Sequence, residues 1–231
     1  MLSIIIPTLN EEEYLPRLLD SIRRQNFSDA EIIIADAGSK DRTVEIAKQY
    51  GCSIVEGGLP AKARNNGATY AQGDVLFFLD ADTVLPDNFI ENSLNEFSMR
   101  GLGIASFMLM AKNTFSNLLI DIFYNKLILI TEKILPHSAM GILAKKEIFK
   151  KIHGYDETIT LAEDHDLGRR AAKHAKFGVI KSAKIITSDR RFKEDGWVGT
   201  GVKYLLCELH MIFLGPVRSN IFKYKFGHYK K

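Results

Sequence analysis

One stretch of the chain decides how the rest is interpreted: Val75-Leu76-Phe77-Phe78-Leu79-Asp80-Ala81-Asp82. Five consecutive large apolar residues lead directly into two carboxylates. An apolar run of this length, rich in Val and Phe and preceded by turn residues, is typical of a strand buried on both faces of a sheet. In an open α/β sheet, ligands bind outside the carboxyl ends of the strands. The stretch therefore predicts a buried strand that ends where a ligand would bind.

Asp80 and Asp82 are separated only by the small Ala81. Carboxylate oxygens suit hard divalent cations, and Mg²⁺ is usually held by one or two carboxylates together with substrate phosphates. The pair therefore predicts a site for a divalent cation (Mn²⁺ or Mg²⁺) that carries a diphosphate. The alternative is an Asp that caps the following turn, which is the usual role of an isolated Asp-x-Asp.

Length and composition indicate one large globular domain. The chain has 231 residues, of which 46% are apolar and 26% charged, and its net charge of +3 is too small to indicate nucleic-acid binding. Cys52 and Cys207 lie far apart without metal-ligand spacing, as in a protein of a reducing compartment. The N-terminus leads straight into an apolar run, so we expect no signal peptide and a cytoplasmic location.

The first third of the chain alternates strand and helix patterns. Apolar runs predict strands at 3–8, 31–36 and 52–55, and the segments between them have helical periodicity. Asn10 and Glu13 stand in capping-box spacing, so we expect the first helix to begin there and to end near Gln25. This order predicts a parallel sheet with right-handed connections.

Two further residues are candidates for nucleotide binding. Asp36 ends the second predicted strand, where an acidic residue commonly binds ribose or base in dinucleotide folds. The dinucleotide fingerprint G-x-G-x-x-G is absent after the first strand, which disfavours a dehydrogenase. A glycine-rich loop over 57–67 enters a helix whose N-terminus suits phosphate, and Arg64 could add a charged fork. Taken alone, an arginine such as Arg64 is more often a surface residue than a ligand.

Four segments in the first 90 residues resemble the nucleotide-sugar half of family 2 glycosyltransferases with the GT-A fold. They are, in chain order, 3–12 (SIIIPTLNEE), 35–41 (ADAGSKD), 63–67 (ARNNG) and 78–82 (FLDAD). The resemblance implies that Asp36 contacts the base and ribose, that Arg64 lines the nucleotide pocket, and that Asp80 and Asp82 bind the metal and the diphosphate. It also implies that Thr8, Asn10 and Glu11 of the first segment lie at the donor.

The resemblance implies an α/β fold: a GT-A-like single domain with a mostly parallel central sheet flanked by helices, as in nucleotide-diphospho-sugar transferases. Residues 1–90 would form the nucleotide-sugar half and 91–200 the acceptor half, followed by a basic and aromatic tail over 201–231. Patterns in the second half predict a helix at 88–99 and strands at 102–110 and 180–188.

The segment 115–135 is strongly apolar, but Asp121, Asn125, Lys126 and Glu132 interrupt it. A spanning helix needs about 20 predominantly apolar residues, so we do not expect a transmembrane helix. A core helix, or one that faces a second copy in a homodimer, is favoured over a helix at a membrane interface.

Residues 163–167 read Glu-Asp-His-Asp-Leu, and the family places its catalytic base in a motif of this form. The resemblance assigns that role to Asp164, because a general base needs a carboxylate near the acceptor hydroxyl. The alternative is an acidic cap of a helix that begins near Leu167. His137 stands in a segment that resembles the family's acceptor-side loop, although an isolated loop histidine is usually solvated.

Two segments near the C-terminus leave alternatives open. Arg190 and Arg191 could neutralise charge on the leaving diphosphate, as in some family members. Trp197 could stack on a sugar or only anchor the tail. Residues 209–231 contain five Lys or Arg, no acidic residue and several aromatic residues, which favours contact with an anionic membrane over a solvated terminus. No nucleic-acid-binding fold accompanies this composition.

The predicted reaction is metal-dependent transfer of a sugar from a nucleoside-diphosphate sugar to a hydroxyl acceptor, for which a lipid-linked or cell-surface glycan is the candidate. Inversion at the anomeric carbon is what the family mostly performs. A sugar nucleotidyltransferase is disfavoured, because its phosphate-cradling basic loop is absent after the first strand. A non-catalytic nucleotide-sugar-binding or membrane-docking protein of the same fold is the alternative from another class.

Overall fold

Strands and helices alternate through the first half of the chain, as the sequence predicts. The structure is a computed structural model that describes residues 1–111, 113–138, 140–188, 197–219 and 221–222. The elements of the first half are β1 (Leu2–Thr8), α1 (Leu15–Arg23), β2 (Ala30–Asp36), α2 (Thr43–Gln49), β3 (Ser53–Glu56), α3 (Pro60–Tyr70), β4 (Val75–Leu79), β5 (Thr83–Val84) and α4 (Phe89–Met99).

The second half contributes longer strands and a helix with a π-helical segment. Its elements are β6 (Ile104–Ala111), α5 (Thr114–Leu119), the π-helix η1 (Ile120–Asn125), α6 (Lys126–Thr131), β7 (Gly141–Lys145), α7 (Lys146–Lys151), α8 (Glu163–Ala172), β8 (Phe177–Thr187) and α10 (Trp197–Phe213). The predicted strands at 102–110 and 180–188 correspond to β6 and β8, and the predicted helix at 88–99 corresponds to α4.

The strands form one eight-stranded sheet in the order β3-β2-β1-β4-β7-β6-β8-β5. The strands β3, β2, β1 and β4 are parallel, β7 runs antiparallel to β4 and β6, and β8 is parallel to β6. The predicted α/β domain with a mostly parallel sheet is confirmed. The short β5 was not predicted. It pairs antiparallel with β8, and so brings the turn after β4 to the end of β8.

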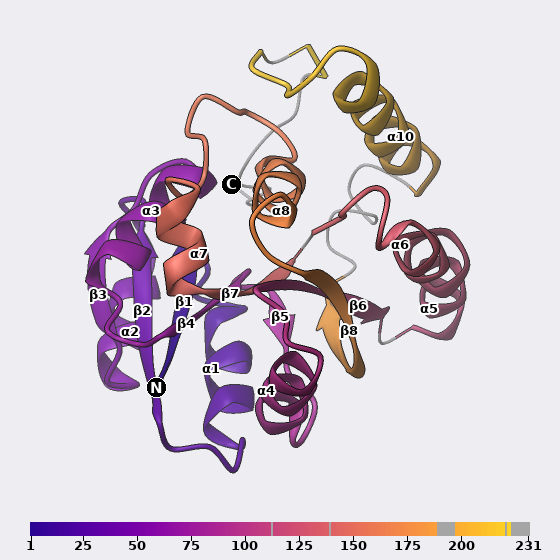
Figure 1. The fold of residues 1–231 in the computed structure, drawn as a ribbon. Helices are drawn as coiled ribbons and strands as arrows, with labels where there is room; N and C mark the ends of the chain where they lie inside the picture. The colour runs from indigo at the N-terminus through magenta and orange to yellow at the C-terminus, as the bar shows by residue number, and fades with distance from the viewer. Residues whose placement is uncertain (112, 139, 189–196, 220, 223–231) are drawn as a thin grey trace.

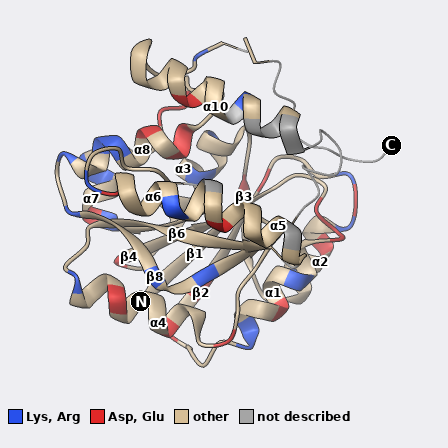
Figure 2. Cartoon of the chain, turned by 90° about the vertical axis from the view of Figure 1, so that its right-hand side faces the viewer, with Lys and Arg blue, Asp and Glu red and all other residues tan. Residues whose placement is uncertain are grey.

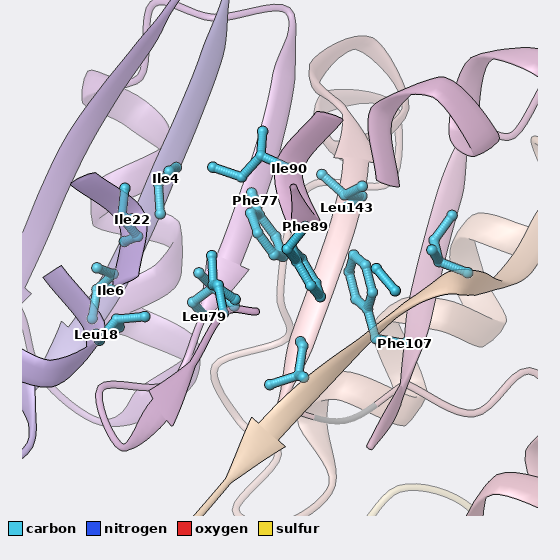
Figure 3. Close-up of a cluster of buried hydrophobic side chains, with 14 of the residues drawn as sticks. Ile4, Ile6, Leu18, Ile22, Phe77, Leu79, Phe89, Ile90, Phe107 and Leu143 are labelled. Carbon is cyan, nitrogen blue, oxygen red and sulfur yellow. The ribbon is translucent and has the colours of Figure 1, made fainter. Parts of the chain in front are cut away.

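The core lies on both faces of this sheet, because successive side chains of a strand point to opposite sides. Ile4 and Ile6 of β1 pack into the cluster beneath α1 and α4, whereas Ile5 packs into the cluster beneath α3, α7 and α8. The same alternation occurs in β4, where Phe77 stacks on Phe89 of α4 with ring centroids 6.0 Å apart (Figure 3). Figure 1 shows these two helical layers on either side of the sheet.

Two predicted helix starts are wrong. Helix α1 begins at Leu15, after Tyr14 as N-cap, and no capping box forms at Asn10 and Glu13. Asn10 has a left-handed φ of 53°, and its side-chain carbonyl accepts a hydrogen bond from the amide of Lys40 instead. Helix α8 begins at Glu163 rather than near Leu167. Three acidic residues in its first turn favour this earlier start, because they interact well with the helix dipole.

The apolar segment at 115–135 folds as the continuous helix α5–η1–α6. Asn125 attaches it to β6, because its side chain donates to the carbonyl of Leu109 and accepts from the amide of the same residue, both at 2.8 Å. No helix among the described residues is long and apolar enough to cross a membrane. Residues 220 and 223–231 of the basic tail lie outside the described residues.

Candidate functional site

Asp36 joins the carboxyl ends of β1 and β2. Its Oδ1 accepts hydrogen bonds from the hydroxyls of Thr8 (3.0 Å) and Ser39 (2.5 Å), and its Oδ2 accepts from the amides of Gly38 (3.0 Å) and Ser39 (2.9 Å). Thr8 and Asp36 are opposite each other in the parallel register of the two strands. The sheet therefore brings these two predicted donor-site residues together, and the contacts hold the Asp36 carboxylate in one orientation.

Asn10 and Glu11 belong to the same network. The amide of Asn10 donates to the hydroxyl of Ser39 at 2.8 Å, and the amide of Glu11 donates to the hydroxyl of Thr43 at 2.7 Å. The loop after β1 is thus bound to the loop after β2 through backbone groups. This arrangement brings all four predicted residues of the first two loops to one edge of the sheet.

An open pocket of about 570 Å³ lies beside Asp36. Its lining includes Gly57 and Gly58 from the loop after β3 and Lys62 from α3. Gly57 is required for this packing, since a Cβ there would lie 2.5 Å from the backbone carbon of Asp36. The pocket combines a carboxylate that can accept hydrogen bonds with a lysine that can pair with phosphate.

Arg64 does not line this pocket but points into a cluster of carboxylates. It is buried, and its Nη2 donates to Asp80 Oδ1 at 2.8 Å while its Nη1 donates to Glu163 Oε1 at 2.6 Å. The Oδ1 of Asp164 lies 3.6 Å from the same Nη1. Burial opposes the charge of the guanidinium, but the surrounding acids, Asp164 first, hold the pKa of Arg64 well above its ordinary value. Arg64 therefore links the end of β4 to the start of α8.

Asp164 is the carboxyl group of this cluster that can still accept a proton. Its side chain is 16% exposed, but its Oδ1 is buried and has no hydrogen-bond partner among the described residues. Burial raises the pKa of Asp164 to about 7, and the charges of Glu163 and Asp80 act in the same direction, against the attraction of Arg64. A carboxyl group whose pKa lies near neutrality can accept a proton at physiological pH.

The two neighbouring acidic residues are already bound to arginines. Glu163 is bound to Arg64, and Asp166 accepts a hydrogen bond from Arg170 at 2.6 Å on its own helix. Asp164 thus differs from both in lacking a bonded cation at hydrogen-bonding distance. The three carboxylates lie within four residues of one another in the sequence, but the structure gives each of them different bonding partners.

Asp80 and Asp82 occupy the turn between β4 and β5. Arg64 binds Oδ1 of Asp80, and Asp82 Oδ2 accepts a hydrogen bond from the hydroxyl of Ser188 at 2.6 Å. Both carboxylates are partly exposed. Two oxygen donors on one turn fit a hard divalent cation whose remaining ligands come from phosphate and water.

His137 is buried rather than solvated. Its Nε2 lies 3.2 Å from Glu208 Oε2 of α10, and His165 Nδ1 lies 2.9 Å from the same oxygen. Burial opposes ionisation of Glu208, but these two hydrogen bonds hold its pKa well below the ordinary range, whereas burial lowers the pKa of His165. Within the described ranges, these three side chains are the one group of three potential metal ligands whose atoms lie within 4.8 Å of one another. Arg169 also binds Glu208, so the group attaches α10 to α8.

Three predicted site residues cannot be placed. Arg190 and Arg191 lie outside the described residues, and of Trp197 only its backbone, the first residue of α10, is described.

Sequence reasoning missed Tyr155, whose buried ring lies 5.4 Å below the Arg64 guanidinium. Burial first, and the charge of Asp164 next, raise the pKa of the Tyr155 phenol well above its usual value. Ser188 and Glu208 were also missed. No local pattern marks these residues, because each reaches the site from a distant part of the chain.

Comparison with known proteins covers most of the chain. The sequence model described as glycosyl transferase family 2 matches residues 3–136. The minor teichoic acid biosynthesis protein GgaB of Bacillus subtilis (strain 168) is 31% identical over 214 residues, or 84% of this chain, but the chain spans only 23% of that relative.

Two solved structures share the fold at low sequence identity. S. aureus TarS 1-349 in complex with UDP-GlcNAc has a TM-score of 0.64 at 18% identity, over 98% of this chain and 76% of that one. The mannosyltransferase PcManGT from Pyrobaculum calidifontis, in complex with GDP-Man and Mn²⁺, has a TM-score of 0.70 at 16% identity, over 89% and 64% of the two chains.

Proposed function

The chain belongs to glycosyl transferase family 2, and from this premise we propose that it transfers a sugar from a nucleoside-diphosphate sugar to a hydroxyl acceptor, with Asp164 as the general base. The observation that carries the proposal is the state of Asp164. Its carboxyl group is largely buried and has a pKa of about 7, and its buried Oδ1 has no hydrogen-bond partner among the described residues. Its two acidic neighbours are bound to arginines.

The donor would bind at the carboxyl ends of β1, β2 and β4. We assign base and ribose to the pocket beside Asp36, where Lys62 can meet a phosphate. Thr8, Asn10 and Glu11 act mainly by holding the loops that form this pocket. The nucleotide sugars bound to TarS and PcManGT support a donor of this class.

Asp80 and Asp82 are the residues that would hold a divalent cation. The Mn²⁺ in PcManGT supports this assignment, as does the oxygen-only donor set of the two residues. When bound, such a cation supplies Lewis-acid stabilisation of the departing diphosphate. Arg64 would keep Asp80 in position from inside the domain, since its guanidinium is fixed between Asp80 and Glu163.

The chemical step is a direct displacement. The acceptor oxygen forms a bond to the anomeric carbon, and the bond from that carbon to the diphosphate oxygen breaks with its electron pair. Asp164 takes the proton of the acceptor hydroxyl. One displacement inverts the configuration at the anomeric carbon. The name of GgaB, a protein of teichoic acid biosynthesis, supports a cell-surface glycan as the acceptor class.

Hydrolysis of nucleotide sugars in the presence of Mn²⁺ tests the proposal without knowledge of the acceptor, because water can replace the hydroxyl. We expect slow hydrolysis by the wild type, loss of it in Asp164→Asn, and retention in Asp166→Asn, the matched control on the same helix. A protein that only binds nucleotide sugars would show binding without turnover. Hydrolysis retained in Asp164→Asn and lost in Asp166→Asn would place the base two residues further along the chain.

A further inference from the structure

Helix α10 turns apolar side chains toward solvent. Six exposed residues recur at spacings of three and four, which places them on one face: Val202, Leu205, Leu206, Leu209, Ile212 and Phe213. The opposite face packs Cys207, Glu208 and Met211 against the domain. A surface helix normally has the reverse arrangement, with its apolar stripe toward the core. The outer face of α10 therefore has the character of a contact surface.

The segment α5–η1–α6 carries a second outward apolar face. The exposed residues are Leu118, Ile122, Leu127 and Ile130 in the helix and Ile134 in the turn after it, and Ile130 and Ile134 are 78% and 87% exposed. Figures 1 and 2 place this segment and α10 on the same side of the molecule, the side that faces the viewer in Figure 2. Exposed apolar surface on two neighbouring elements is more than the scattered single residues of an ordinary surface.

The charges that accompany these faces are positive. Lys126 and Lys133 are exposed on the second face. The acids of that segment are engaged elsewhere: Glu132 accepts from Arg100 and from the amide of Val179, and Asp121 accepts from Lys184 at 3.2 Å. Between positions 209 and 231 the sequence contains five Lys or Arg and no acidic residue. The complementary partner is apolar and negatively charged.

We propose that the outer faces of α10 and α5–η1–α6 bind the surface of an anionic phospholipid membrane. The aliphatic side chains would enter the boundary between headgroups and acyl chains, and the lysines would lie at the phosphates. Two other occupants fit the charge less well. A second copy of the chain, related by a two-fold axis, would bring its lysines against the same lysines of the first copy. The C-terminal tail of the same chain would also add lysines. An anionic membrane matches both the apolar character and the positive charge of these faces.

This surface is connected to the catalytic residue of the proposed function, on which the following step rests. Glu208 on the inner face of α10 binds His165, the neighbour of Asp164. Membrane contact through α10 would therefore hold the proposed base close to the lipid surface. The acceptor class that suits this placement is a hydroxyl carried on a lipid.

Vesicle co-sedimentation tests the surface. The probes are phosphatidylcholine vesicles with and without phosphatidylglycerol, and the variant is the double substitution Leu205→Gln with Leu209→Gln. We expect binding only to the vesicles that contain phosphatidylglycerol, and we expect salt to weaken it. Binding should be about tenfold weaker in the double variant, because two exposed leucines that would enter the membrane become polar. Met99→Gln is the control: Met99 is an apolar residue on α4 that is more exposed than either leucine, and this variant should bind as the wild type does.

Several results would overturn the proposal: no binding to either vesicle, equal binding to both, or unchanged binding of the double variant. So would a wild-type dimer that the double variant converts to a monomer, since a second copy would then be the occupant. Increased binding of a hydrophobic dye after removal of residues 223–231 would identify the tail as the occupant. Failure here is distinct from failure of the proposed function: Asp164→Asn should still bind vesicles, and the double variant should still hydrolyse donor in lipid-free solution.

Discussion

Replacement of Asp164 by Asn should separate a catalytic base from a structural carboxylate through the pH dependence of stability. The pKa of Asp164 is raised from 3.8 to about 7 in the folded protein, chiefly by burial. The folded state therefore binds this proton more tightly than the unfolded state does. Its contribution to the free energy of unfolding is complete below about pH 4 and is lost as pH rises through about 7. Three pKa units at 1.36 kcal/mol each give a loss of roughly 4 kcal/mol.

Asn cannot ionise, so Asp164→Asn should escape this loss. Urea unfolding between about pH 4 and pH 7 should show that the free energy of unfolding of the variant rises relative to that of the wild type. The difference should be the same few kcal/mol. Its transfer rate should fall on the order of 10²–10⁴ with little change in donor affinity. Wild-type turnover should rise with pH through about 7, because the base must be deprotonated.

Asp166→Asn is the control, because it breaks only a pair with Arg170 on the same helix. It should cost about 0.2–0.5 kcal/mol and leave turnover intact. If the stability of Asp164→Asn follows the wild type in parallel at every pH, the burial argument for this carboxyl group is wrong. If its turnover is normal, another residue is the base.

Three further substitutions test the rest of the site. Asp82→Asn should abolish the Mn²⁺ dependence of nucleotide binding, measured by calorimetry, without lowering the melting temperature; unchanged metal-dependent affinity would remove Asp82 from the metal site. Asp36→Asn should raise the Michaelis constant for the donor more than it lowers turnover, because uniform binding is lost; a fall in turnover alone would contradict a role in donor binding. Arg64→Met should lower the free energy of unfolding by about 3–5 kcal/mol, because it leaves buried acids without their cation; equal stability in denaturant would show that the ion pairs contribute little.

The sequence by itself determined the central sheet and the edge at which the site lies. The runs at 4–6 and 75–79 are apolar at every position, and such runs are typical of strands buried on both faces, so their place in the centre of the sheet follows from local composition. The positions of Asp36 and Asp80 at strand ends follow from the same local signal. The choice of Asp164 from among three carboxylates came from resemblance to a family motif.

The tertiary structure alone decided what surrounds these residues. Arg64 binds acids that are 16 and 99 residues away, and the burial that raises the pKa of Asp164 is produced by packing of distant segments around it. The periodicity of α10 shows that it has an apolar face but not which way that face points. Its direction is seen only in the folded chain, where Glu208 on the inner side of α10 binds His165 and Arg169 of α8. Local sequence specifies the elements, whereas long-range ion pairs and burial specify their orientation.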